Sequence, residues 1–136
     1  MRKIRVLIGI FGLDQHEVGA LSVARMLIDG GMEVIYAGRF NTPSKLMRIA
    51  VQEDVDVIGV SCHSWEYIDY TPELMELMKK EGVDIPVVLG GSVITPADEL
   101  VLKNLGIAAV FGPGAAREDI IATISELGAR NKNTAG

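Results

Sequence analysis

The feature that most constrains this chain is the regular alternation of short apolar runs with amphipathic stretches along nearly its whole length. The apolar runs are rich in Val and Ile and almost unbroken in hydrophobicity, which is typical of parallel strands covered on both faces. Strands are predicted at 4–10, 32–37, 56–61, 85–90 and 108–111. Helices are predicted at 17–30, 43–53, 67–81, 96–105 and 115–129.

Five strand–helix units of this length predict an α/β fold of the doubly wound, flavodoxin-like kind. We expect a five-stranded parallel sheet of strand order 2-1-3-4-5 with helices on both faces. A chain of 136 residues is the size of one domain. We expect that domain to span residues 1–130, followed by a small polar C-terminal tail, 131–136, that is disordered.

Composition excludes several classes of partner and location. The net charge of −5 argues against nucleic acid, since no basic stripe is present to neutralise phosphates. No apolar run is long enough to span a bilayer, and the N-terminus lacks the pattern of a signal peptide. The single cysteine, Cys62, excludes an internal disulfide and fits a reducing compartment. We therefore expect a cytoplasmic protein that binds neither nucleic acid nor membrane.

A compact ligand unit follows the first predicted strand, in the stretch Asp14-Gln15-His16-Glu17-Val18-Gly19. A carboxylate two residues before an imidazole can fix the orientation and tautomer of the ring. A glycine three residues later lets a bulky group approach the backbone. Loops that leave parallel strands are where open α/β sheets bind ligands. The motif alone leaves open what His16 holds.

Glycines and polar residues also follow the later strands, at the same predicted edge of the sheet. They are Ser61, Cys62, His63, Ser64 and Trp65, then Gly90, Gly91 and Ser92, then Gly112, Pro113 and Gly114. Glycine leaves the backbone bare. A flat or extended ligand could therefore pass between the strand ends and lie close to the sheet.

Common phosphate sites of this fold fit the sequence poorly. Gly9, Gly12 and Gly19 do not have the spacing of a dinucleotide-binding fingerprint, and no P-loop is present. A phospho-receiver domain needs an Asp after the third strand, where this chain has Ser61-Cys62. A flavodoxin-type phosphate loop would be rich in Ser and Thr where this chain has Asp and His.

Two simpler interpretations of the polar residues remain. Asp14 and His16 could merely cap the helix that begins near Glu17. A zinc-like site could use three of Asp14, His16, Cys62 and His63, although no short motif pairs these ligands.

Four motifs occur together and in order: Asp14-x-His16-x-x-Gly19, Ser61, Gly90-Gly91 and Gly112-Pro113-Gly114. With them the chain resembles the cobalamin-binding domain of adenosylcobalamin-dependent carbon-skeleton mutases. It is most similar to the methylmalonyl-CoA mutase group, which includes the separate small subunits of isobutyryl-CoA and 2-hydroxyisobutyryl-CoA mutases. The resemblance covers the chain from the first strand to about residue 129.

The resemblance implies a role for each motif. His16 would be the axial cobalt ligand in place of the dimethylbenzimidazole base, an arrangement called base-off/His-on, and Asp14 would accept a hydrogen bond from its other ring nitrogen. Gly19 would leave room for the nucleotide tail between strands 1 and 3, and Ser61 would hydrogen-bond the displaced base. The remaining residues expected to contact the cofactor are Gln15, Val18, His63, Gly90, Gly91, Gly112, Pro113 and Gly114.

Two positions depart from the pattern of the family. Ile10 stands where many methylmalonyl-type domains carry a Lys four residues before the motif Asp. The usual Ser-x-Leu after the third strand reads Ser61-Cys62-His63, so a small apolar loop has become polar. The lining around the cofactor is therefore expected to differ from the common one.

The function implied by the resemblance is that of a cofactor-binding subunit. The chain would bind adenosylcobalamin for a radical 1,2-rearrangement of an acyl-CoA, and would be inactive without a large TIM-barrel subunit that binds the substrate. The expected complex is a heterotetramer, a dimer of heterodimers. The alternatives are a corrinoid protein that carries methyl groups and a non-catalytic cobalamin storage or sensor module.

Overall fold

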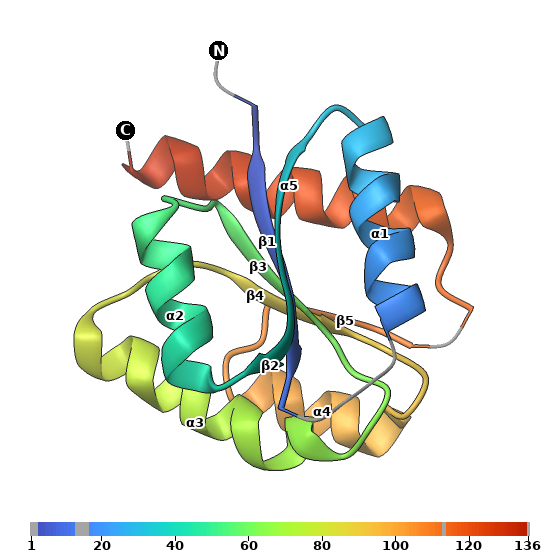
Figure 1. Ribbon diagram of the computed structural model, residues 1–136, viewed down its shortest axis with the longest axis vertical. Helices are drawn as coiled ribbons and strands as arrows, with labels where there is room; N and C mark the ends of the chain where they lie inside the picture. Colours follow the sequence, from blue (N-terminus) through green and yellow to red (C-terminus); the bar gives the residue numbers. More distant parts are fainter. Residues whose placement is uncertain (1–2, 13–16, 113, 136) are drawn as a thin grey trace.

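The computed structural model describes residues 3–12, 17–112 and 114–135, with side chains through residue 130. Its centre is a five-stranded parallel sheet of order β2-β1-β3-β4-β5, which confirms the predicted fold class and strand order (Figure 1). The strands are β1 Arg5–Phe11, β2 Glu33–Asn41, β3 Val57–Ser61, β4 Val87–Gly90 and β5 Ala109–Phe111.

Helices cover both faces of the sheet. They are α1 Glu17–Asp29, α2 Pro43–Gln52, α3 Glu66–Glu81, α4 Pro96–Asn104 and α5 Arg117–Ala135. One buried cluster joins Ala20 and Leu27 of α1 to Ile120 and Ile124 of α5, over one face of the sheet. A second cluster holds the buried faces of α2, α3 and α4 on the other side. Figure 1 shows the same division, with α1 and α5 apart from α2, α3 and α4.

Local chemistry explains where several helices begin and end. Thr42 and Thr95 are N-caps whose side-chain oxygens accept backbone N–H groups, and each is followed by a proline. Asp98 completes a capping box with Thr95. Gly82 ends α3 in the left-handed conformation that glycine adopts most readily.

The second strand is longer than predicted, because it continues beyond 37 to Asn41. After a register shift opposite Gly9, Asn41 pairs with Phe11. Its buried amide donates to the carbonyl oxygens of Ile10 (3.1 Å) and Gly38 (2.8 Å). These side-chain bonds add to the strand pairing where the register is irregular.

The last helix is also longer than predicted, because it ends at Ala135 and not near residue 129. The backbone of 131–135 is therefore helical where the polar composition favoured a disordered tail. No proline or glycine interrupts residues 129–135, so nothing in the chain forces the helix to stop earlier. Among the described residues, no helix has both the length and the hydropathy that a membrane span needs.

The strand register places two rows of residues under α1 and α5. The row at the carboxyl edge contains Ile10, Ser61, Gly90 and Phe111 in successive strands. The row two residues earlier contains Ile8, Gly59, Val88 and Ala109. Residues two apart on a strand point to the same face, so both rows face the same pair of helices.

Candidate functional site

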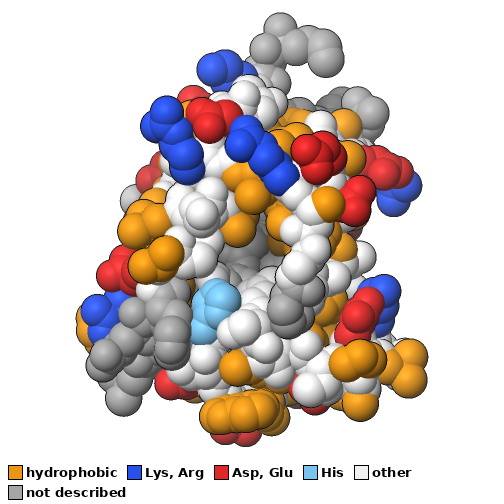
Figure 2. Space-filling view, turned by 90° about the vertical axis from the view of Figure 1, so that its right-hand side faces the viewer, with side chains coloured by type: hydrophobic (Ala, Val, Ile, Leu, Met, Phe, Trp, Pro, Cys, Tyr) orange, Lys and Arg blue, Asp and Glu red, His pale blue; other side chains and the backbone are white. Residues whose placement is uncertain are grey.

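A cavity of about 240 Å³ lies above these two rows, between α1 and α5, at the carboxyl edge of the sheet. Its floor includes Gly59, Ser61 and Gly90. Figure 2 shows the molecule hollowed on this side, with a histidine at the rim of the hollow. The cavity therefore lies where open α/β sheets usually bind ligands.

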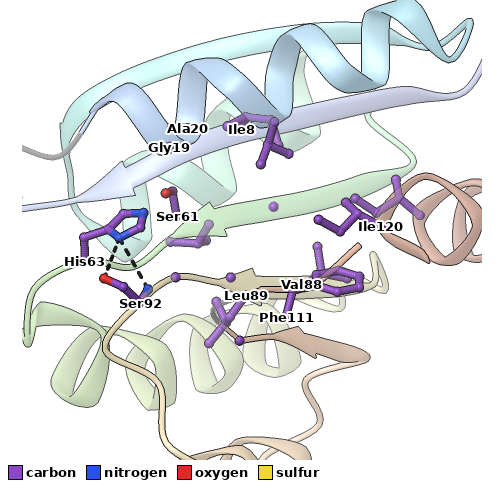
Figure 3. A pocket seen from close by; sticks show the side chains of 18 of the residues that line it. Ile8, Gly19, Ala20, Ser61, His63, Val88, Leu89, Ser92, Phe111 and Ile120 are labelled. Atoms are coloured by element: carbon purple, nitrogen blue, oxygen red, sulfur yellow. Dashed lines mark hydrogen bonds between the residues drawn. The ribbon is translucent and has the colours of Figure 1, made fainter. Parts of the chain in front are cut away.

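The two helices that flank the cavity meet at one end and separate at the other. Near the C-terminal end of α1, Arg117 lies 3.8 Å from Asp29, and Gly30 packs close to Ile121. At the opposite end of α1, Gly19, Ala20 and Val23 line the cavity and Ile120 and Ile124 of α5 line its other wall. The walls are thus apolar and the space between them is a slot over the sheet (Figure 3).

Gly59 leaves the floor of the cavity bare, and the sequence analysis did not single it out. A Cβ at this position would lie 2.8 Å from Cδ1 of Ile8 and 3.6 Å from Cγ2 of Val88. A glycine inside an otherwise Val- and Ile-rich strand often marks close approach by a ligand or another backbone. That pattern was visible in the sequence at Val57–Ser61.

The loops that follow β3 and β4 are in direct backbone contact. The N–H of Cys62 donates to the carbonyl oxygen of Gly90 at 2.7 Å, and the N–H of Gly91 donates to that of Phe111 at 3.1 Å. A Cβ on Gly91 would overlap the carbonyl group of Cys62. Only glycine fits here, so this glycine sets how the two loops meet at the cavity mouth.

That contact brings His63 and Ser92 together at the mouth. Nδ1 of His63 lies 2.9 Å from Oγ of Ser92 and 3.4 Å from the backbone nitrogen of Ser92 (Figure 3). The opposite edge of the imidazole packs against α1, since a Cβ on Gly19 would lie 2.6 Å from Nε2 of His63. The ring thus bridges the loop after β4 and the start of α1.

The start of α1 is anchored to the edge strand by its first residue. Oε2 of Glu17 accepts a hydrogen bond of 2.6 Å from the hydroxyl of Tyr36, and Oε1 lies 3.9 Å from Nη1 of Arg39. Burial, followed by the Glu17 hydrogen bond and charge, raises the pKa of Tyr36 to about 12. The tyrosine therefore stays protonated and keeps donating to Glu17 at neutral pH.

The cavity brings together seven of the residues that the sequence analysis proposed for the site. They are Gly19, Ser61, His63, Gly90, Gly91, Gly112 and Gly114. Val18 does not line it, because its side chain is 82% exposed on α1. Asp14, Gln15, His16 and Pro113 lie outside the described residues.

Of the four residues of the zinc-like alternative, Cys62 and His63 lie in the described part of the chain, and Asp14 and His16 lie outside it. Among the described residues, no three His, Cys, Asp or Glu side chains gather as metal ligands would. Cys62 is buried in the core under α2, α3 and α4, whereas His63 lines the cavity on the opposite face. These neighbours in sequence therefore point to different sides of the sheet, continuing beyond Ser61 the alternation of β3.

Comparison with known proteins matches this arrangement to one family. The family model of the B12 binding domain matches residues 4–122. This range includes all the described residues that line the cavity except Ile124. The chain belongs to the B12-binding domain family. It is 38% identical to the pivalyl-CoA mutase small subunit of Xanthobacter autotrophicus, over 96% of this chain and 88% of that protein. It is also 38% identical to the 2-hydroxyisobutanoyl-CoA mutase small subunit of Aquincola tertiaricarbonis, over 91% of each chain.

Solved structures agree with this B12-binding domain at the level of the fold. A cobalamin-binding protein from Desulfitobacterium hafniense superposes with a TM-score of 0.73 at 20% identity, over 88% of this chain and 56% of that one. The Desulfitobacterium hafniense protein therefore shares the flavodoxin-like fold of this domain. The mutase small subunits, which match over nearly their whole length, are the relatives that bear on function.

Proposed function

We propose that this B12-binding domain is the cofactor-binding small subunit of an adenosylcobalamin-dependent acyl-CoA mutase. The observation that carries the proposal is the cavity between α1 and α5, with a bare glycine floor under apolar walls. It begins at the N-terminal end of α1, whose first three residues are the last three of the Asp14-x-His16-x-x-Gly19 motif. The named activities of the two small-subunit relatives supply the reaction class.

The cavity fits a displaced cobalamin base and its nucleotide tail. A flat aromatic base needs apolar walls and a floor without side chains, which Ala20, Ile120 and Gly59 provide. Side chains at Gly59 or Gly19 would intrude on Ile8 or His63. At Gly112 and Gly114 no atom lies within 4 Å of a Cβ position, so the backbone there is open to a ligand.

The cobalt ligand and its orienting group are assigned from the sequence motif. We assign His16 as the axial ligand, base-off/His-on, and Asp14 as the acceptor that holds the ring. Ser61 lies on the cavity floor, where its hydroxyl would meet the displaced base. Bound adenosylcobalamin supplies the carbon radical that starts a 1,2-rearrangement. This chain's own residues would bind the cofactor and orient it.

The proposed partner is a large mutase subunit that binds the acyl-CoA. The support is that the two relatives matched over nearly their full length are both named small subunits. We expect that partner to be a TIM barrel and the complex to be a heterotetramer. A methyl-carrying corrinoid protein or a storage module would bind cobalamin without such a partner.

The test uses the electron paramagnetic resonance spectrum of bound cob(II)alamin. A protein grown with ¹⁵N-labelled histidine should split each cobalt line into a doublet, because the axial nitrogen then has spin one half. His16→Ala should lose the doublet. A triplet from the unlabelled benzimidazole in the labelled wild-type protein would overturn the His-on assignment.

The mutase role needs a second measurement. Purified chain should show no mutase activity alone, and should gain it with adenosylcobalamin and a large subunit encoded in the same genome. If the chain binds cobalamin tightly but no such large subunit gives mutase activity, the methyl-carrier or storage alternatives would be favoured.

A further inference from the structure

The end of β2 is bonded to the residue that precedes the motif segment, residues 13–16. The N–H of Gly12 donates to the carbonyl oxygen of Asn41 at 2.9 Å, and the N–H of Phe40 donates to that of Gly12 at 3.0 Å. Phe40 has a φ of 65°, a left-handed conformation that is uncommon outside glycine. Strained backbone of this kind persists where the surrounding contacts hold it. The first flank of the motif segment is therefore held by backbone bonds to β2.

The residue that follows the motif segment is bonded to the same strand by side chains. Oε2 of Glu17 accepts a hydrogen bond of 2.6 Å from the hydroxyl of Tyr36, and Oε1 lies 3.9 Å from Nη1 of Arg39. Tyr36 pairs with Ile8, which lines the cavity, so the tyrosine lies one strand further out in the same row. The end of β2 thus holds both flanks of the segment that contains the proposed cobalt ligand.

The first turn of α1 is also held on its cavity side. A Cβ on Gly19 would lie 2.6 Å from Nε2 of His63, so the imidazole packs directly against this turn. The contact at Glu17 comes from β2, whereas the contact at Gly19 comes from the loop after β3. A turn held by two different elements has little freedom to shift over the sheet. Among these contacts, the hydrogen bond from Tyr36 is one that depends on a single oxygen atom.

We infer that Tyr36 is a positioning residue for the cobalt ligand: through Glu17 it fixes the start of α1, and so places the imidazole of His16 within reach of cobalt. The inference rests on the proposed function, since it requires His16 to bind cobalt. A ligand that is held in place beforehand costs less to order when the cofactor arrives. Tyr36 does not line the cavity, so its effect on binding should pass through His16.

The test uses cobinamide, a corrinoid without the nucleotide, which has no base of its own to compete with histidine. The affinity for aquohydroxocobinamide is measured by absorption titration. Tyr36→Phe removes only the hydroxyl, and it should weaken binding about fivefold, the net contribution of one hydrogen bond. In a His16→Ala background the same change should alter the affinity by less than about twofold, because there is then no imidazole to place.

Electron paramagnetic resonance reports the ligation itself. Protein with ¹⁵N-labelled histidine is loaded with cob(II)inamide, and the wild type should show the doublet of an axial histidine nitrogen. In Tyr36→Phe a smaller fraction of the signal should be split into the doublet. The remainder should show no nitrogen splitting, because no other nitrogen base is present.

Tyr67→Phe is the matched control for the loss of a buried hydroxyl. It also removes a hydroxyl that donates to a carboxylate, but it does so in the core on the other side of the sheet. Its affinity for cobinamide should stay within about twofold of the wild type. That result separates the placement of His16 from a general loss of stability.

Two variants of Glu17 test the acceptor of the same hydrogen bond. Glu17→Gln and Glu17→Ala both remove the negative charge, but only the glutamine keeps an oxygen that can accept from Tyr36. Glu17→Gln should keep most of the affinity for cobinamide. Glu17→Ala should lose about as much as Tyr36→Phe.

The outcomes separate this inference from the proposed function. A wild type without the doublet would overturn the His-on assignment of the proposed function, and the inference with it. A wild type with the doublet, together with an unchanged Tyr36→Phe or an equal loss with and without His16, would overturn the role of Tyr36 alone. Far-ultraviolet circular dichroism verifies that each variant is folded. If Tyr36→Phe is not, the Glu17 pair decides, and equal affinities for Gln and Ala would contradict the inference.

Discussion

The carbonyl group of Cys62 lies where a side chain on Gly91 would have to be. This contact presses the loop after β3 against the loop after β4. It places the two cavity-lining side chains of those loops, His63 and Ser92, within hydrogen-bond distance. The mouth of the cavity is thus organised by two backbone segments that are far apart in the sequence.

The closeness of Gly91 to Cys62 makes this glycine the least replaceable at the site. Gly91→Ala should lower the free energy of unfolding by about 3 kcal/mol or more, because the obstructing atoms are backbone and cannot rotate away. Urea unfolding followed by circular dichroism measures the change. Gly112→Ala is the matched control, since no atom lies within 4 Å of a Cβ there. Similar unfolding midpoints for both variants would contradict the contact.

The bare floor at Gly59 should matter for the ligand more than for the fold. The nearest atom to a Cβ at this position is the flexible end of Ile8, which can shift. Gly59→Val suits a strand but fills part of the cavity floor. We expect cobalamin affinity to fall at least about tenfold. Cobinamide has the corrin ring and cobalt but lacks the nucleotide tail. It should bind the variant almost as tightly as it binds the wild type. A parallel loss for both ligands would mean that the valine disturbs more than the floor.

The hydrogen bond between the buried Tyr67 and the partly exposed Asp98 predicts a stability change at alkaline pH. The hydroxyl of Tyr67, which is 2% exposed, donates to Oδ2 of Asp98 at 2.9 Å. Burial, followed by the hydrogen bond to Asp98, raises the pKa of Tyr67 from 10.0 to about 12. Because the folded pKa lies above the unfolded one, this stabilisation is complete below pH 10 and is lost as the pH rises toward 12.

Tyr67→Phe isolates that contribution. The variant should be about 1 kcal/mol less stable than the wild type at pH 8, through loss of the hydrogen bond to Asp98. The difference should shrink between pH 10 and 12, because Tyr67 of the unfolded wild type ionises there while the folded state keeps it protonated, and the variant has no phenol to ionise. Urea unfolding at several pH values measures both proteins under the same conditions, so the titration of other groups cancels. A difference that stays constant through this range would contradict the assigned pKa.

Much of the fold could be predicted from the sequence because it depends on local patterns. Runs of Val and Ile at strand length and helices with one apolar stripe are readable one element at a time, and 2-1-3-4-5 is a common strand order for five such units. The differences lie at the ends of two elements. Asn41 extends β2 through side-chain hydrogen bonds, and α5 continues through polar residues that nothing interrupts.

For the site, the sequence by itself determined which residue types lie at the carboxyl edge of the sheet. It identified the Asp14-x-His16-x-x-Gly19 motif, Ser61 and the glycines after β4 and β5, because strand ends share one edge. Only the tertiary structure decided that Gly59 is the floor, that Ser92 holds His63, and that α1 and α5 diverge to leave a cavity. Those relationships depend on packing between segments distant in the chain, and no local pattern encodes the distance between them.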